Sequence, residues 1–284
     1  MPTYASLGEI KAQMQAGAGS SSTNDDKVLA LARAATAYVD RMFQQRRPYF
    51  FPYNEARQFR VDGTHINSWD NTLVFNDNLL ALTTLTVAGT TVTAVELFPT
   101  LSSPVNSLRL TSISDNWWSY CSTDASPNFA TVTGIWGMHR DYANAWLSVD
   151  VAAAIGTTTA TTFTVADVDG YDANYRIPRL SAGHLIKIDS EYMEVTNTVV
   201  ASNTVTVRRG IHGSTAATHA AAAPVYVWQV EDTIRNEVAR QVGYMYARQG
   251  AYENASIDQL GLMQFPPNVV ASLAAAMGGF AYGN

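Results

Sequence analysis

Residues 26–45 read DKVLALARAATAYVDRMFQQ, with an apolar residue every three or four positions. That spacing is typical of an amphipathic helix, which buries one stripe of side chains against the rest of the protein. Arg46 and Arg47 suit the C-terminal end of such a helix, and Pro48 prevents it from continuing far. The residues that we assign to the buried stripe are Val28, Leu31, Ala35, Val39 and Met42.

A second amphipathic helix is predicted from Glu231 to about Gly250, and acidic residues at its start suit the positive end of the helix dipole. Because short helices owe most of their stability to packing, each helix needs a partner, and the simplest partner is the other helix. Ala30, Ala34 and Ala37 leave an uncharged flank on the first helix, which either permits close approach of another backbone or only reflects the helix propensity of alanine. The buried stripe of the second helix comprises Ile234, Val238, Val242 and Met245.

Between the two helices the apolar period changes from 3.6 to 2, and threonine, valine and aromatic residues become frequent, which is typical of strands. We divide this stretch into a first β region over 57–156 and a second small β module over 157–229. An alanine- and threonine-rich segment, 151–162, links the two. Strand candidates in the first region are 59–62, 79–87, 91–98, 108–113 and 131–136.

The second β module has five alternating apolar pairs, which predict five short strands in a small antiparallel barrel or sandwich. The pairs are Phe163 and Val165, Ile186 and Ile188, Met193 and Val195, Val205 and Val207, and Val225 and Val227.

The expected fold class is therefore α+β, with a helical scaffold of two main amphipathic helices and a large antiparallel β insertion built of sandwich or small-barrel modules. Residues 25–56 and 230–250 form the helical scaffold domain. Extended arms flank it at both ends. Residues 1–24 form an N-terminal arm, which contains the flexible composition GAGSSS over 17–22, and residues 251–284 form a C-terminal arm.

The C-terminal arm has no lysine or arginine after Arg248 and is rich in apolar residues. Such a segment needs a surface to cover it, so we expect it to dock on a partner protein; a frayed terminus is the alternative. The residues assigned to this docking arm are Ile257, Leu260, Leu262, Met263, Phe265, Val269, Val270, Leu273, Met277 and Phe280.

Composition narrows the class of function. The 284 residues include only 15% charged residues, and the net charge is −6, which argues against a surface that neutralises nucleic-acid phosphates. The single cysteine, Cys121, excludes an intramolecular disulfide, and we interpret it as an ordinary small residue rather than a reactive thiol. No apolar run resembles a signal peptide or a membrane span, so we do not expect the protein to associate with a membrane. We expect it to assemble in a reducing cytoplasm.

Motifs for catalysis or metal binding are incomplete. His139-Arg140-Asp141 is similar to a kinase catalytic loop, but Trp146 stands where that loop requires asparagine. Asp167-Val168-Asp169-Gly170 begins like a calcium loop, but its twelfth position is Pro178. The histidines show no zinc-binding HExxH pattern. We therefore expect no catalytic, cofactor-binding or metal site and no enzyme, while scattered carboxylates leave a two-carboxylate glycosidase open.

Three segments of the second β module form a recognisable pattern, and a fourth lies in the first β region. They are 190–195 (SEYMEV), 204–210 (TVTVRRG), 213–219 (GSTAATH) and 131–137 (TVTGIWG), the last followed by His139. The first three resemble a small β-module that recurs in tailed-bacteriophage virion proteins, and the fourth resembles a segment of phage neck proteins. Together with the flanking helices, they resemble head-to-tail adaptor (connector) proteins over about residues 25–250.

The resemblance implies a structural protein of the virion neck, assembled in the host cytoplasm. Such adaptors form a ring, usually of twelve copies, between the portal protein and the tail or neck proteins. Their helices line the ring, their C-terminal segments dock on the portal, and genomic DNA passes through the channel without sequence-specific binding. The β-module also occurs elsewhere in virions, so a tail, fibre-attachment or capsid-decoration protein remains an alternative, as does a virion-associated cell-wall glycosidase.

Overall fold

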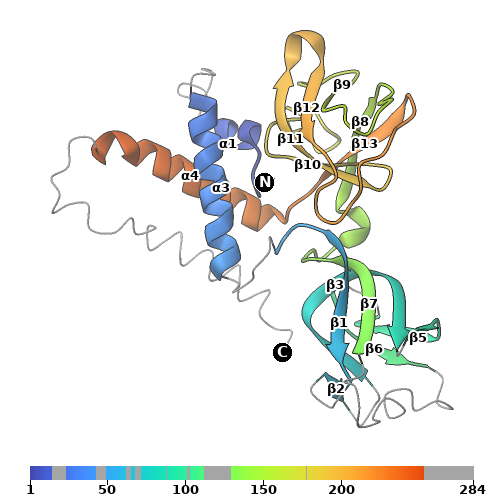
Figure 1. The fold of residues 1–284 in the computed structure, drawn as a ribbon. Coiled ribbons are helices and arrows are strands. Elements are labelled where there is room, and N and C mark those ends of the chain that lie inside the picture. Colours follow the sequence, from blue (N-terminus) through green and yellow to red (C-terminus); the bar gives the residue numbers. More distant parts are fainter. Residues whose placement is uncertain are drawn as a thin grey trace. The chain divides into compact units, whose positions relative to one another are not determined.

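The computed structural model describes residues 1–14, 24–42, 49–61, 65–67, 72–87, 89–100, 103–111, 129–176 and 178–252. The chain divides into two compact units (Figure 1). Unit 1 comprises Met1–Pro48 together with Trp146–Asn284, and unit 2 comprises Tyr49–Ala145. Unit 2 is therefore a continuous insertion in the chain of unit 1.

The expected fold class is wrong. The described residues form two antiparallel sheets, of seven and six strands, with three α-helices, so the protein is mostly β and is not a two-helix scaffold with an insertion. The helical period of residues 26–45 is the clearest local signal in the sequence. A strong local signal, however, does not determine which elements share a core, because strand pairing is set by contacts between distant residues.

The sheet of unit 1 has the strand order β8-β13-β10-β11-β12-β9. Its strands are β8 (Trp146–Ala152), β9 (Thr162–Thr164), β10 (Leu185–Ile188), β11 (Glu191–Val199), β12 (Thr204–Arg208) and β13 (Ala223–Trp228). The two outer strands meet through a bridge between Ala152 and Val165, and the Ala153 amide donates to the Thr164 carbonyl over 2.8 Å. The sheet thereby closes into a small barrel (Figure 1).

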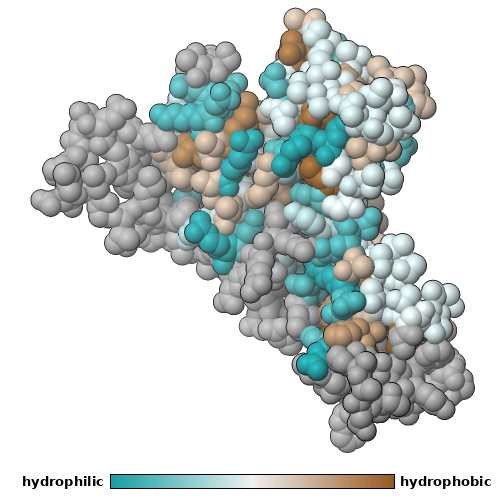
Figure 2. Space-filling view, viewed as in Figure 1, coloured by the Kyte–Doolittle hydropathy of each residue, from teal (hydrophilic) through white to brown (hydrophobic). Residues whose placement is uncertain are grey.

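Alternating side chains fill the interior of this barrel, as the period of 2 requires. The buried interior residues include Val149, Phe163, Ile186, Ile188, Met193, Val195, Val205, Val207, Val225 and Val227. At the tip of the β11–β12 hairpin, by contrast, Val199 and Val200 are exposed. Figure 2 shows a hydrophobic patch at this end of the barrel.

The three helices of unit 1 are α1 (Leu7–Gln13), α3 (Asp25–Met42) and α4 (Asp232–Tyr252), and they pack against one another. Helix α1 begins with a capping box, in which the Ser6 side chain accepts from the Glu9 amide and the Glu9 side chain accepts from the Ser6 amide. The three helices lie against one another (Figure 1), and each has apolar side chains that are buried. The buried residues are Ile10, Val28, Leu29, Ala32, Ala35, Val39, Ile234, Val238, Ala239 and Val242.

Residues 1–14, which we assigned to the N-terminal arm, pack on the loop before β10. The Thr3 amide donates to the Gly183 carbonyl over 3.0 Å, and the Leu7 amide donates to the Ala182 carbonyl over 2.9 Å. Tyr4 is buried, and its hydroxyl donates to the carboxylate of Asp40 on α3. These contacts join the start of the chain to both the barrel and the helices of unit 1.

Unit 2 contains the seven-stranded sheet, with the strand order β1-β7-β3-β6-β5. Its strands are β1 (Tyr53–Arg60), β2 (Ile66–Asn67), β3 (Thr72–Val87), β4 (Thr90–Val92), β5 (Val95–Phe98), β6 (Val105–Leu110) and β7 (Phe129–Trp136), and β2 and β4 both pair with β3. Phe59, Phe75 and Trp136 form an aromatic cluster in its core, with ring centroids 5.2–5.8 Å apart. Such edge and tilted contacts add to the burial of the rings.

Gly134 lies in β7 where strand β3 approaches closely. A β-carbon at this position would overlap the Ala81 carbonyl oxygen and lie 2.8 Å from a methyl group of Leu79. Replacing Gly134 by alanine should therefore force the central strands apart and lower the free energy of unfolding by about 1–3 kcal/mol. Chemical denaturation of the full chain measures this loss.

Gly156→Ala is the matched control, because nothing lies within 4 Å of a β-carbon there. We expect the control to stay within about 0.5 kcal/mol of the parent protein. Equal stabilities of the two variants would contradict the close approach of β7 to β3.

Candidate functional site

Glu191 is a carboxylate with no exposed side-chain surface inside unit 1. It is the first residue of β11 and pairs in register with Ile188, the last residue of β10. Only Asp189 and Ser190 form the turn between these strands, and Asp189 has a positive φ of 51°. This tight turn directs the Glu191 side chain toward the loop after β12.

Arg209, directly after β12, binds both oxygens of Glu191. Its Nε donates to Oε1 over 2.9 Å, and its Nη2 donates to Oε2 over 2.6 Å. The remaining guanidinium donors reach backbone carbonyls: Nη1 donates to Thr157 over 2.7 Å and Nη2 donates to Ala217. The bidentate pair is thus buried with its donors in use, as a buried ion pair requires.

His219 and two backbone amides complete the set of contacts to Glu191. The His219 Nε2 lies 2.8 Å from Oε2, and its Nδ1 lies 2.7 Å from an oxygen of Asp189. The amides of Gly210 and Ala217 donate to the two carboxylate oxygens over 3.2 and 2.9 Å. We call these residues, Glu191, Arg209 and His219, the Glu191 cluster.

Two opposing effects determine the pKa of Glu191. Burial raises the pKa, because it disfavours the charged form. The hydrogen bonds from Arg209, the Ala217 amide and His219, together with the positive charge of Arg209, lower it by more. The pKa therefore lies below its ordinary value of 4.5, and Glu191 is ionised at neutral pH.

The contacts that the structure shows for the Glu191 cluster join segments of the barrel to one another. A nucleophilic mechanism needs a hydroxyl or thiol beside the histidine, and a glycosidase needs two carboxylates facing a sugar. The hydroxyl of the same loop, on Ser214, donates to the Ile211 carbonyl and accepts from the Tyr192 amide. The cluster instead joins the β10–β11 turn, the end of β12, the segment before β9 and the loop before β13.

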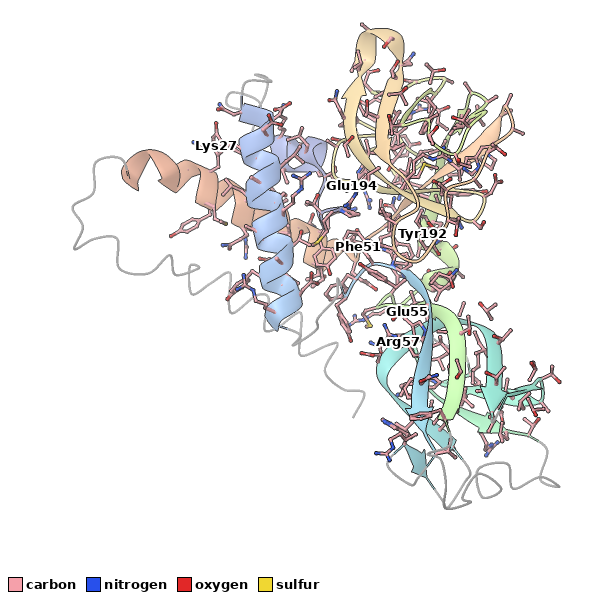
Figure 3. The ribbon with its side chains drawn as sticks, in the orientation of Figure 1. Lys27, Phe51, Glu55, Arg57, Tyr192 and Glu194 are labelled. Atoms are coloured by element: carbon pink, nitrogen blue, oxygen red, sulfur yellow. The ribbon has the colours of Figure 1, made fainter. Side chains whose placement is uncertain are left out.

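A second buried carboxylate, Glu194, connects the barrel to the helices. Its side chain is 2% exposed, and Arg208 Nη2 lies 2.7 Å from Oε2. From α3, Arg33 Nη2 lies 3.6 Å from Oε1, and the amino group of Met1 lies 2.8 Å from both oxygens. Figure 3 shows Glu194 on β11, on the side of the barrel that faces α3.

Aromatic rings gather on the outer face of the barrel, around Lys187 of β10. The Lys187 ammonium lies 4.7 Å from the centroid of Trp146 and 5.1 Å from that of Tyr226. Trp146 also stacks on Tyr192 at 5.4 Å and meets Trp228 edge-on at 5.0 Å. Burial lowers the pKa of Lys187, while the ring faces offer its charge a favourable environment.

The structure describes the helix-stripe residues that we predicted from the sequence, but not the residues of the docking arm. Val28, Ala35, Val39, Ile234, Val238 and Val242 are buried, and Leu31 and Met245 are partly buried. Met42 is the last residue of α3. The docking-arm residues Ile257, Leu260, Leu262, Met263, Phe265, Val269, Val270, Leu273, Met277 and Phe280 lie outside the described residues.

The two motifs set aside in the sequence form local turns. The Asp141 amide donates to the His139 Nδ1 over 3.0 Å, and the Asp167 Oδ1 accepts from the amides of Asp169 and Gly170. Among the described residues, no group of three or more His, Cys, Asp or Glu side chains is placed to hold a metal ion. No described helix is long and apolar enough to span a membrane.

The Glu191 cluster could not be predicted as a site from sequence. Its residues lie in the segments 190–195, 204–210 and 213–219, where composition indicates only strands and an ordered loop. The available signal was Arg209, a charged residue followed by glycine at the end of an apolar strand. Comparison with models of protein families, with curated proteins and with solved structures found no match.

Substituting Glu191 by glutamine removes the carboxylate charge and leaves Arg209 buried without its ionic partner. We expect the free energy of unfolding to fall by about 3–5 kcal/mol, the usual cost of breaking a buried pair. The control is Glu96→Gln, which removes the partly exposed pair between Glu96 and Arg109 and should cost about 1 kcal/mol or less. Equal losses in urea denaturation would show that the cluster does not stabilise the barrel.

The lowered pKa of Glu191 also predicts a pH dependence. A carboxylate with a depressed folded-state pKa stabilises the protein above its unfolded-state pKa, and this stabilisation is lost as the pH falls through the folded-state value. The stability difference between the parent protein and Glu191→Gln should therefore be full at pH 6 and shrink below the ordinary value of 4.5. Unfolding curves measured from pH 6 to pH 3 would reveal a constant difference if the inference is wrong.

Proposed function

We propose that this protein is a structural component of a tailed-bacteriophage virion, a head-to-tail adaptor that forms a ring between the portal and the tail or neck. Its role in this proposal is mechanical and has no catalytic step. Repeated contacts between copies close a ring around a channel, as head-to-tail interfaces do when the rotation closes. The copy number that the resemblance implies is usually twelve.

One observation carries the proposal. The three segments by which the second β module resembles phage virion proteins are those that meet in the Glu191 cluster. Residues 190–195 supply Glu191, residues 204–210 supply Arg209 and Gly210, and residues 213–219 supply Ala217 and His219. The similar residues are thus the ones that hold the barrel together, which supports a shared module over a chance likeness of composition.

The helices take a different part in the proposed ring from the one that the sequence suggested. Because Arg33 of α3 contacts Glu194 of β11, an ionic contact joins the helices and the barrel of unit 1. We propose that unit 1 as a whole, and not a pair of helices, builds the ring. Unit 2 is then free to contact tail or neck proteins, and the segment 251–284 is the proposed portal-docking arm.

The net charge of −6 suits a channel for DNA. Like charges repel, so an acidic protein binds the phosphate backbone weakly and lets genomic DNA pass without sequence-specific contacts. The proposed location is the neck of the virion, after assembly in the host cytoplasm.

A second candidate is a tail, fibre-attachment or capsid-decoration protein. The Glu191 cluster favours it as much as it favours the adaptor, because the cluster lies entirely in the β-module and involves none of the helices. The position in the virion separates the two: an adaptor is found only at the portal vertex.

The adaptor proposal is tested by co-expressing the full chain with the portal protein of the same phage. We expect the two to purify together, and mass measurement of the complex to give a ring with many copies of this chain. Negative-stain images of the complex should show that ring. A chain that stays monomeric and does not bind the portal protein would end the proposal.

A further inference from the structure

The turn 181–184, directly before β10, is the part of the barrel on which the start of the chain lies. Three consecutive residues of this turn each accept one amide hydrogen bond from the segment 3–8. The pairs are Thr3 with the Gly183 carbonyl at 3.0 Å, Leu7 with the Ala182 carbonyl at 2.9 Å and Gly8 with the Ser181 hydroxyl at 2.9 Å. A change in the path of the turn therefore acts on all three hydrogen bonds together.

Two glycines bring the backbone of the segment 3–8 close to the turn and its flank. Gly183 has a positive φ of 96°, and a β-carbon there would overlap the Thr3 hydroxyl. A β-carbon at Gly8 would overlap the ring of Pro178, which lies shortly before the turn. Because little space separates the two segments, a small shift of the turn is transmitted to residues 3–8.

His184 holds the turn closed through its side chain and its backbone. Its Nδ1 accepts a hydrogen bond of 3.2 Å from the Ser181 amide, and its own amide donates to the Ser181 carbonyl over 3.2 Å. Only a neutral imidazole has a nitrogen that can accept in this way. Protonation places a hydrogen on Nδ1, where it faces the hydrogen of the Ser181 amide, so the turn loses this bond.

Charged groups from three elements act on His184, which is mostly buried. Burial lowers its pKa, because it disfavours the charged imidazolium. The carboxylates of Glu9 on α1 and Asp172 in the loop before the turn raise the pKa. The guanidinium groups of Arg235 on α4 and Arg176 lower it. The pKa of His184 lies below its ordinary value of 6.5, and the ring is neutral when it accepts the Ser181 amide.

We propose that protonation of His184 is a pH-sensitive switch that loosens residues 3–8 from the barrel. A histidine whose pKa is lowered in the closed turn binds a proton more readily once the turn opens. The attachment is therefore complete above pH 6.5 and weakens as the pH falls below that value. The inference concerns unit 1 by itself and holds whether or not the chain forms the proposed ring.

The segment stays attached to the helices while it loosens from the turn. The Tyr4 amide donates to the Thr36 hydroxyl over 3.1 Å, and the Tyr4 hydroxyl donates to Asp40, so both contacts lie on α3 and neither involves the turn. The amides of Leu7 and Gly8, at the start of α1, have their partners in the turn. These two amides therefore report on the switch most directly.

The amino group of Met1 is a second group of this segment whose protonation changes with pH, and it acts in the opposite direction. Burial lowers its pKa, and its contact with Glu194 is strengthened when it is protonated. Acidification thus tightens the contact with Glu194 and loosens the contact with the turn. A loss of attachment on acidification has to come from a group other than this amino group.

Amide hydrogen exchange of the full chain, followed by NMR from pH 7.5 to pH 5.5, tests the switch. We expect the protection factors of Leu7 and Gly8, corrected for the pH dependence of free amides, to fall below pH 6.5 by up to about tenfold per pH unit. The same spectra give the titration of the His184 ring, which should have a pKa below 6.5. Constant protection factors, or a ring pKa of 6.5 or higher, would overturn the inference without the need for any variant.

His184→Asn is the matched variant, because the asparagine Oδ1 can replace Nδ1 as the acceptor for the Ser181 amide and does not titrate. The fall in protection should disappear in this variant. It should persist in His139→Asn, which removes a ring of unit 2 whose Nδ1 also accepts an amide hydrogen. A His184→Asn chain that loses protection on acidification as the parent chain does would assign the effect to another group and end the proposal.

Discussion

The barrel of unit 1 depends on keeping one ionised carboxylate, that of Glu191, away from water. An isolated charge in such a position would be costly, and it is tolerated here because Arg209, His219 and two backbone amides surround it with donors. Each donor comes from a segment that is otherwise only a connection between strands. The need to satisfy one buried charge therefore fixes the paths of the loops that close the barrel.

Glu194 is a second buried carboxylate of β11, and its partners come from elements outside the barrel interior. It lies three residues further along β11, and its partners come from α3, from the start of the chain and from the end of β12. Alternate residues of one strand thus serve two purposes: Met193 and Val195 fill the apolar interior, whereas Glu194 binds the elements packed outside it. Arg33 of α3 and the amino group of Met1 thus connect the helices and the start of the chain to the barrel by ionic contacts.

Local periodicity predicted individual elements from the sequence well, and it predicted their assembly poorly. The stripe of Val28, Ala35 and Val39 and that of Ile234, Val238 and Val242 are buried, and the alternating pairs of the second module lie in β9 to β13 or directly beside them. Strand β8 was assigned to the first β region, but its partner is β13, and Trp146 pairs with Trp228 far along the chain. That pairing, like the contact of Glu191 with Arg209, follows from register and topology, which no local pattern contains.

Unit 2 enters and leaves the chain at neighbouring points. The Tyr49 carbonyl, near its beginning, accepts a hydrogen bond of 2.8 Å from the Met138 amide near its end, and Tyr53 is paired with Trp136. Insertions whose ends meet are tolerated because the host domain needs only a short gap to be bridged. Removal of unit 2 would therefore leave only a short gap for a linker to bridge between the two points at which the chain leaves and re-enters unit 1.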